Sequence, residues 1–220
     1  MVYNPKIHHR RSIRLKGYDY SQKGKYYITI CVQNRKCLFG KTTDKKMMLN
    51  DSGKMIEKWY FELENKYPNV KCREYVVMPN HFHCIIEIMG NPRDVHGTDD
   101  PVRNAHTSDA HGGTSLRGRP FRGRPEYDGH PEKNAHSKSP YGPENKKFNA
   151  SIFDMMDWFK TMTTNEYIRG VKTKNWPRFE KRLWQLRYWD RIIRDENGYK
   201  RISNYIINNP ENWETDKLNN

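Results

Sequence analysis

The chain has 220 residues, a length typical of one domain with extensions or of two small domains. Only 35% of the residues are hydrophobic and the mean hydropathy is −1.10, so we expect part of the chain to lie outside any folded core. The 40 Lys and Arg residues outnumber the 26 Asp and Glu residues and give a net charge of +14. Such a charge favours a polyanionic partner, above all nucleic acid, over a merely soluble basic protein.

The sequence predicts neither a membrane protein nor a secreted one. No apolar run approaches the roughly 18–20 residues that a transmembrane helix needs, and the basic N-terminal segment lacks the apolar stretch of a signal peptide. The cysteines lack CxxC spacing, which argues against a zinc–thiolate site and for a reduced, cytoplasmic protein. They are Cys31, Cys37, Cys72 and Cys84.

The first part of the chain predicts a strand, a helix and two further strands. Residues 26–32 are β-branched and aromatic, as is typical of a strand. Residues 54–66 carry apolar side chains at helical spacing and end before a proline, which predicts a helix. Strands are then expected over residues 70–78 and 81–89, with a tight turn or bulge at residues 79–80.

Residues 91–148 differ in composition from the rest of the chain. Gly, Pro, His, Asp, Asn and Ser dominate this segment, and it shows no apolar period. Such a segment cannot bury enough apolar surface to offset the entropy of ordering, so we expect a disordered insertion. It holds 10 basic and 8 acidic residues, a net charge of +2, which leaves +12 on the other 162 residues. The positive charge therefore belongs mainly to the folded part.

The part after the insertion predicts a helix, a strand and a last helix. Residues 151–169 have a helical apolar period, with Gly170 as the expected C-cap. Residues 183–193 are strand-like, and residues 196–208 form a helix that ends before Pro210.

This order of elements predicts an α+β fold. It lacks the regular alternation of a doubly wound sheet, so we expect an antiparallel sheet with helices packed on one or both faces. Residues 1–90 and 149–220 would form a single domain that the insertion interrupts.

A pair of histidines lies at the start of the strand predicted over residues 81–89. Side chains alternate along a strand, so His81 and His83 point to one face and the intervening apolar set to the other. Two imidazoles about 7 Å apart on one strand can converge on a divalent metal. Two surface histidines on an edge strand are the simpler interpretation, but here the pair lies within an apolar strand, where polar side chains need partners.

A tyrosine and an asparagine lie one turn apart at the end of the last predicted helix. Tyr205 borders the apolar stripe of this helix, and Asn209 follows four residues later on the same face. The phenol could supply a nucleophile and the amide oxygen a third metal ligand. Alternatively, Tyr205 is a boundary residue and Asn209 caps the helix before Pro210.

Basic residues interleaved with aromatic ones suit phosphate and base contacts to a single-stranded nucleic acid, although solvated surface charge is the alternative for each of them. Arg10 to Lys16 form a basic N-terminal arm, and a second group precedes the last helix together with Trp176, Trp184, Tyr188 and Trp189. The candidate DNA contacts are Arg10, Arg11, Arg14, Lys16, Arg187 and Arg191.

Three stretches, in the same order along the chain, carry a resemblance to a known family. They are RRSIRLKGYDY with YYITICVQNRKCLFG, then VVMPNHFHCII, and finally LWQLRYWDRIIRDENGYKRISNYIINNPENW. In them the sequence resembles the REP-associated tyrosine transposases, a bacterial branch of the HUH single-strand nuclease and transposase superfamily. The resemblance covers nearly all of the chain outside residues 91–148, and the insertion is the departure from it.

The resemblance implies a ferredoxin/RRM-like HUH fold with four or five antiparallel strands. It also implies that His81, His83 and Asn209 hold Mg²⁺ or Mn²⁺ and that Tyr205 is the nucleophile. The implied activity is a DNA transposase that cleaves and rejoins single-stranded DNA at hairpin-forming, REP-like sites through a 5′-phosphotyrosine intermediate. The family includes monomers and homodimers, and both stay open.

Two other functions stay open at this point. One is an HUH replication initiator or relaxase, which usually carries a second tyrosine or further domains; this chain has no GxxxxGK[ST] segment. The other is a non-catalytic RRM-like nucleic-acid binder, which predicts exposed aromatic side chains on the sheet. Tyr199 and Tyr188 are the rival nucleophiles, and Tyr199 lies in the apolar stripe of the last helix.

Overall fold

A computed structural model of the chain describes residues 14–15, 17–90, 147 and 149–219, all within one compact unit. Its main sheet is antiparallel and has the strand order β4-β5-β1-β6. The strands are β1 (Gly24–Cys31), β4 (Val70–Val77), β5 (His81–Ile88) and β6 (Trp189–Ile193). The helices are α1 (Asp51–Lys66), α2 (Ile152–Thr173) and α3 (Glu196–Ile207).

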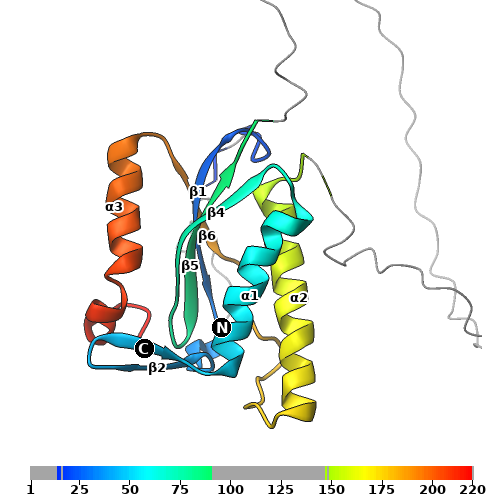
Figure 1. Ribbon diagram of the computed structural model, residues 1–220, viewed down its shortest axis with the longest axis vertical. Helices are drawn as coiled ribbons and strands as arrows, with labels where there is room; N and C mark the ends of the chain where they lie inside the picture. The colour runs from blue at the N-terminus through cyan, green and yellow to red at the C-terminus, as the bar shows by residue number, and fades with distance from the viewer. Residues whose placement is uncertain (1–13, 16, 91–146, 148, 220) are drawn as a thin grey trace, which may run out of the picture. The chain divides into compact units, whose positions relative to one another are not determined.

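The order β1-α1-β4-β5-α2-β6 is the βαββαβ pattern of ferredoxin-like domains. Figure 1 shows α1 and α2 side by side on one face of the sheet and α3 on the other face. The predicted α+β, ferredoxin/RRM-like architecture is therefore confirmed, with four strands in the sheet. The predicted insertion over residues 91–148 lies outside the described residues, apart from Lys147, and stays a prediction.

The main core lies between the sheet and the helix pair. Phe82, Cys84 and Ile86 alternate along β5 toward this side and are almost completely buried. The Phe82 ring stacks on Phe159 of α2 at 5.4 Å and meets Tyr60 of α1 edge-on at 5.3 Å. Burial of this aromatic set holds the sheet against α1 and α2 and leaves the other face of β5 for His81 and His83.

A second, smaller cluster attaches α3 to the opposite face. Ile202 and Ile206 lie one turn apart on α3 and pack on Ile85 of β5. The helix begins at the N-cap Asp195, whose side chain accepts a hydrogen bond from the Gly198 N–H. The cap and the apolar stripe together determine which face of α3 meets the sheet.

Two sequence predictions are wrong at their ends. The strand predicted over residues 183–193 covers only Trp189–Ile193, because Thr29 pairs with Trp189 while Val32 bridges Trp184. Between these two pairs β1 advances by three residues, whereas the partner segment advances by five. The additional residues of that segment therefore cannot pair with β1. The helix predicted to end at Gly170 continues to Thr173. Gly170 instead allows close packing, since a Cβ there would clash with the Trp176 ring.

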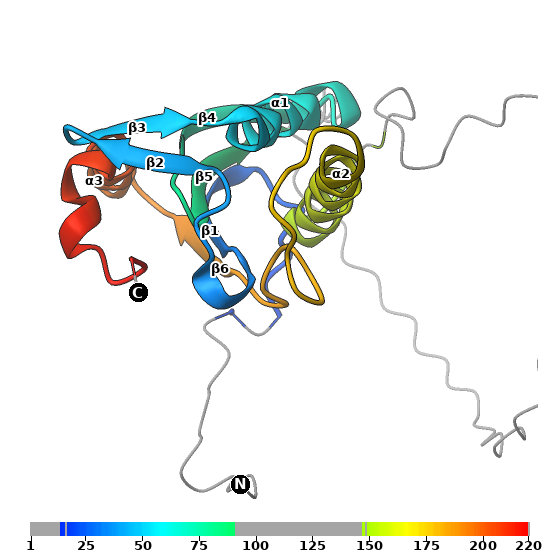
Figure 2. The same cartoon turned by 90° about the horizontal axis from the view of Figure 1, so that it is seen from below.

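A hairpin of β2 (Gly40–Thr43) and β3 (Lys46–Leu49) was not predicted. Its two turn residues, Asp44 and Lys45, have φ values of 50° and 60°. Such turns usually carry Asn-Gly, Asp-Gly or Gly-Gly, so Lys45 in the place of Gly removes the common hairpin signal. The β3 strand contacts the short 3₁₀ helix η3 (Pro210–Thr215), which follows α3 (Figure 2). No helix in the described part of the chain is long and apolar enough to cross a membrane.

Candidate active site

His81 and His83 lie side by side on the α3 face of β5, as their spacing predicts. Both side chains are buried, with exposed fractions of 0% and 1%, and their ring centroids are 4.6 Å apart. Each ring binds a polar partner through Nδ1, which leaves Nε2 for another role. Buried imidazoles that are oriented by hydrogen bonds in this way are typical of a functional site rather than of surface histidines.

Asn80 determines the tautomer of His81. The Asn80 Nδ2 atom donates to the carbonyl oxygens of Leu218 at 2.7 Å and of Arg35 at 3.3 Å. Its Oδ1 atom, which can only accept, lies 2.8 Å from Nδ1 of His81, so this nitrogen carries the proton. The Nε2 atom of His81 therefore keeps its lone pair, and it is buried without a hydrogen-bond partner among the described residues.

His83 connects the sheet to α3. Its Nδ1 atom lies 2.8 Å from the hydroxyl oxygens of both Tyr27 and Thr29 on β1. Its Nε2 atom lies 3.5 Å from the hydroxyl of Tyr205, which α3 carries across the face of the sheet. The Tyr205 side chain is 46% exposed, so its phenol is open to solvent on one side and close to a histidine on the other.

Asn209 lies just beyond the end of α3 and is 1% exposed. Its side chain does not cap a helix; instead, Nδ2 donates to Oδ2 of Asp216 at 3.3 Å. Its Oδ1 atom is buried and has no hydrogen-bond partner in the described part of the chain. Burial lowers the pKa of His81 and raises that of Tyr205, and the Asn209 amide partly offsets both shifts. The structure thus brings His81, His83, Tyr205 and Asn209 together.

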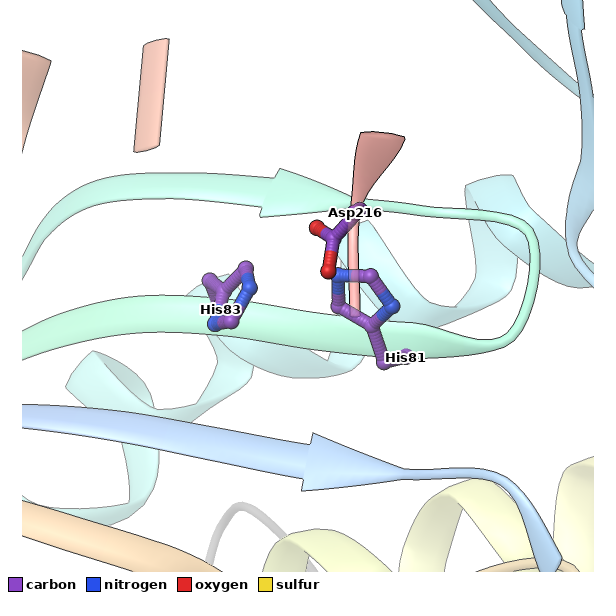
Figure 3. A group of neighbouring side chains, drawn as sticks. All are labelled: His81, His83 and Asp216. Carbon is purple, nitrogen blue, oxygen red and sulfur yellow. The ribbon is translucent and has the colours of Figure 1, made fainter. Parts of the chain in front are cut away.

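Asp216 completes a group that sequence reasoning missed. Ligand atoms of His81, His83 and Asp216 all lie within 4.8 Å of one another. Figure 3 shows the Asp216 carboxylate reaching toward His81 from the C-terminal segment, while both histidines project from β5. Asp216 follows η3, and no helical or strand period connects it to Asn209. Its acidic side chain was the only feature of the sequence that could have indicated Asp216 as part of this group.

The electrostatics of this group suit a cation. Burial lowers the pKa of His81 to about 4, and burial together with the neighbouring His81 lowers the pKa of His83 well below its usual value. Both rings are therefore neutral near pH 7, which is the form that binds metals. Burial raises the pKa of Tyr205, and the nearby Asp216 adds to that effect. The buried lone pairs, the amide oxygen and the carboxylate fit a divalent metal ion.

The two rival tyrosines have other partners. The hydroxyl of Tyr199 donates to both carboxylate oxygens of Glu74 at 2.8 Å. The Tyr188 ring lies below the Arg14 guanidinium, whose carbon is 5.1 Å from the ring centroid. Tyr27 is a further tyrosine beside His83 that the sequence did not single out.

The predicted DNA contacts divide into three groups. Arg10, Arg11 and Lys16 lie outside the described residues. Arg187 and Arg191 are exposed, and Arg191 pairs in register with Tyr27, so it shares the face that carries His83. Arg14 instead forms an ion pair with the buried Asp190, its Nε 2.8 Å from Oδ1. Its position favours a structural role over the predicted contact.

The proteins to which this chain is similar include a relative by sequence and two solved structures. The chain is 35% identical over 217 residues to an uncharacterized protein of Haemophilus influenzae, with 98% of this chain and 96% of that protein covered. The REP-associated tyrosine transposase bound to a REP hairpin has a TM-score of 0.45 and 16% identity, covering 90% of this chain and 73% of that one. A candidate transposase from Deinococcus radiodurans R1 has a TM-score of 0.40 and 12% identity, covering 89% and 97%.

No protein-family model matches the chain. The identity to the Haemophilus influenzae protein extends over almost the full length of both chains. The chain therefore belongs to the same family as this Haemophilus influenzae protein.

Proposed function

We propose that the protein is a metal-dependent DNA transposase that cuts and rejoins single-stranded DNA at hairpin-forming sites. Tyr205 would be the nucleophile, with His81, His83 and Asn209 around a divalent cation. One observation carries the proposal: the Tyr205 hydroxyl lies 3.5 Å from Nε2 of His83, beside the buried, unpartnered Nε2 of His81 and Oδ1 of Asn209. The resemblance to the REP-associated tyrosine transposases, whose motifs contain these residues, supports the same assignment.

The chemical step is a transfer of the phosphodiester to Tyr205. The phenol oxygen attacks phosphorus and its proton passes to solvent, while the bond from phosphorus to the 3′ oxygen breaks; this oxygen takes up a proton from solvent and leaves as a free 3′-OH. The 5′ side of the DNA stays bound as a phosphotyrosine. Attack by the 3′-OH of another strand then breaks the bond between phosphorus and Tyr205, so DNA is rejoined without ATP.

The residues around Tyr205 prepare this step. Burial raises the pKa of Tyr205, which opposes deprotonation, whereas the Asn209 amide lowers it. The packing of Ile202 and Ile206 on Ile85 fixes α3, so the phenol is held near the histidines before substrate binds. A divalent cation bound here would act as a Lewis acid on the scissile phosphate and would stabilise the phenolate.

The types of ligand atom in this group favour one divalent cation over another. Mg²⁺ and Mn²⁺ both accept the oxygens of Asn209 and Asp216, but imidazole nitrogen binds Mn²⁺ more readily than Mg²⁺. We therefore expect His81 and His83 to favour Mn²⁺. Asp216 would add the negative charge that His81, His83 and Asn209 lack.

Single-stranded DNA is the proposed substrate because the protein is positively charged and carries basic side chains that are open to solvent. The chain carries a net charge of +14, and Arg187 and Arg191 are exposed. The proposal includes Arg10, Arg11 and Lys16 of the N-terminal arm as further phosphate contacts. The preference for a hairpin comes from the family resemblance.

The test is a covalent-adduct assay on a denaturing gel. Purified protein is incubated with labelled single-stranded DNA hairpins from the flanks of its own gene, with Mn²⁺ or Mg²⁺. We expect a metal-dependent adduct that is lost in Tyr205→Phe and in His81→Ala. Tyr199→Phe is the matched control on the same helix and should keep the adduct. Tyr27→Phe should also keep it, in a reduced amount, because Tyr27 only supports His83.

An adduct that persists in Tyr205→Phe would remove Tyr205 from the mechanism. DNA binding without any adduct, across several hairpins, would favour the non-catalytic RRM-like binder. One observation supports that alternative: Trp189 is exposed on the sheet. The buried, unpartnered atoms of His81 and Asn209 argue against it, since a simple binder does not need them. An HUH replication initiator or relaxase would use the same chemistry and would differ in its DNA site.

A further inference from the structure

The face of the sheet that carries the two histidines changes from buried to exposed across three strands. Thr29 of β1 pairs in register with His83 of β5 on one side and with Trp189 of β6 on the other. Residues directly opposite in neighbouring strands share a face, so these three side chains form one row. Their exposed fractions are 1% for His83, 6% for Thr29 and 47% for Trp189. The row thus leads from the buried site to solvent at the edge strand.

The helix that covers this face does not shield Trp189. α3 packs chiefly on β4, and its apolar stripe rests on Ile85 of β5. β6 lies at the opposite edge of the sheet from β4. Figure 2 shows α3 over one face of the sheet and β6 as a separate strand at the edge of the sheet. The edge of this face formed by β6 is therefore the open side of the site.

Positive charge accompanies the exposed indole. Arg191 lies two residues after Trp189 on the same strand and hence on the same face. It is exposed, and no ion pair involves it within residues 14–15, 17–90, 147 and 149–219. The one acidic residue of β6, Asp190, points to the other face and is paired with Arg14. An aromatic plane with an unpaired guanidinium beside it is the combination that binds an unpaired nucleotide.

The other aromatic residues near β6 lack this combination. Trp184 is 2% exposed and belongs to the main core, and the Tyr188 ring is half-buried under Arg14. Single exposed aromatic side chains are common and need no function by themselves. Trp189 differs because it lies in one cross-strand row with His83 and because Arg191 lies beside it on the same face of the sheet.

We propose that Trp189 is a stacking platform for one unpaired nucleobase adjacent to the scissile phosphate, with Arg191 binding the neighbouring backbone phosphate. The strand spacing of about 4.8 Å puts Trp189 roughly 10 Å from His83 across the sheet, a distance that a single strand covers within a few nucleotides. The inference rests on the proposed function, because it takes His83 and Tyr205 as the place of cleavage. It adds a substrate feature: the base over β6 is unpaired, and a purine stacks better than a pyrimidine.

The test uses Tyr205→Phe as the background so that binding is read without chemistry. The probe is a stem–loop DNA with a single-stranded 5′ extension in which 2-aminopurine replaces each base in turn. Stacking on an indole quenches 2-aminopurine, so we expect quenching at one position of the extension. Trp189→Ala should abolish it and weaken binding by roughly 5- to 150-fold, whereas Trp189→Phe should retain most of both.

The matched control is Phe61→Ala. Phe61 is 48% exposed, close to the 47% of Trp189, but it lies on α1, across the sheet from α3. This variant should bind and quench like the background protein. Unchanged quenching and affinity in Trp189→Ala would overturn the stacking role while leaving the transposase proposal intact. Failure of the background protein to bind the DNA at all would overturn both.

Discussion

Asn80 and His81 are neighbours in the sequence and are also joined through their side chains, with Oδ1 of Asn80 2.8 Å from Nδ1 of His81. The same Asn80 amide donates to the carbonyl of Leu218, 138 positions away. The tautomer of a candidate metal ligand is therefore tied to the C-terminal segment that carries Asp216. Arg35 adds to this link, since its Nη1 atom donates to the carbonyl of Lys217.

Replacing Asn80 should weaken metal binding without removing a ligand. In Asn80→Ala, Nδ1 of His81 loses its acceptor, and the proton can move to Nε2, which then no longer binds a cation. Groups that orient ligands in this way typically contribute 10- to 100-fold to metal affinity. We expect such a loss in Mn²⁺ affinity, measured by electron paramagnetic resonance of free Mn²⁺. Asn65→Ala, an exposed change on α1, should not alter the affinity; an unchanged value in Asn80→Ala would contradict the role of Asn80.

Asp216 should contribute more to metal affinity than its late position suggests. At an effective dielectric constant of 20, a carboxylate about 5 Å from a divalent cation attracts it by on the order of 6 kcal/mol, and about half of this, roughly a hundredfold in Kd, is expected to remain after the cost of desolvating both charges. We expect Asp216→Asn to show a loss of this size in calorimetric titration with Mn²⁺. Glu214→Gln removes an exposed charge from the same segment and serves as the control. Equal affinities for the two variants would place Asp216 outside the metal site.

The two buried histidines should make the metal-free protein sensitive to mild acid. Burial lowers the pKa of His81 from 6.5 to about 4 and that of His83 well below 6.5, so the folded state stays unprotonated where the unfolded state binds protons. The free energy of unfolding therefore reaches its full value above pH 6.5 and falls as the pH decreases toward 4. Each histidine contributes up to about 1.4 kcal/mol per pH unit.

Urea unfolding between pH 7 and 5, with a chelator present, measures the slope of the free energy of unfolding against pH. The double variant His81→Gln, His83→Gln should lose most of it, because neither side chain titrates. A slope that is the same in both proteins would show that other groups cause the acid sensitivity.

Arg14 and Arg191 should have opposite effects on stability and DNA binding. Arg14→Ala leaves the Asp190 carboxylate, 1% exposed, without its ion-pair partner. We expect it to lower the free energy of unfolding by roughly 2–3 kcal/mol, below the range for fully buried pairs because Arg14 reaches solvent. Arg191→Ala should change the stability by less than about 0.5 kcal/mol.

Fluorescence anisotropy with single-stranded DNA at several salt concentrations measures the effect of the same two substitutions on DNA binding. Loss of one phosphate contact reduces the slope of log K against log salt by about 0.7 for a single strand. We expect this reduction in Arg191→Ala and not in Arg14→Ala. A flatter slope in Arg14→Ala would restore Arg14 as a DNA contact.

The local patterns of the sequence were enough for the elements and for part of the site. Alternation along β5 put His81 and His83 on one face, and helical spacing put Tyr205 and Asn209 one turn apart. The sequence missed the hairpin at Asp44 and Lys45, because Lys45 stands where such turns usually carry glycine. The helix predicted to end at Gly170 was wrong for a similar reason: the contact with Trp176, and not the local conformation, requires glycine there.

The sequence by itself determined the order of the four strands of the main sheet and the three α-helices, the shared face of the histidine pair and the spacing between Tyr205 and Asn209, since each depends on a period within a few residues. Only the tertiary structure decided that Asp216 and Asn80 belong to the site, that Arg14 pairs with Asp190, and that Trp189 rather than Trp184 is open to solvent. These features depend on contacts between segments far apart in the chain. Such contacts form when the apolar faces of the sheet and helices pack together, and no local spacing encodes them.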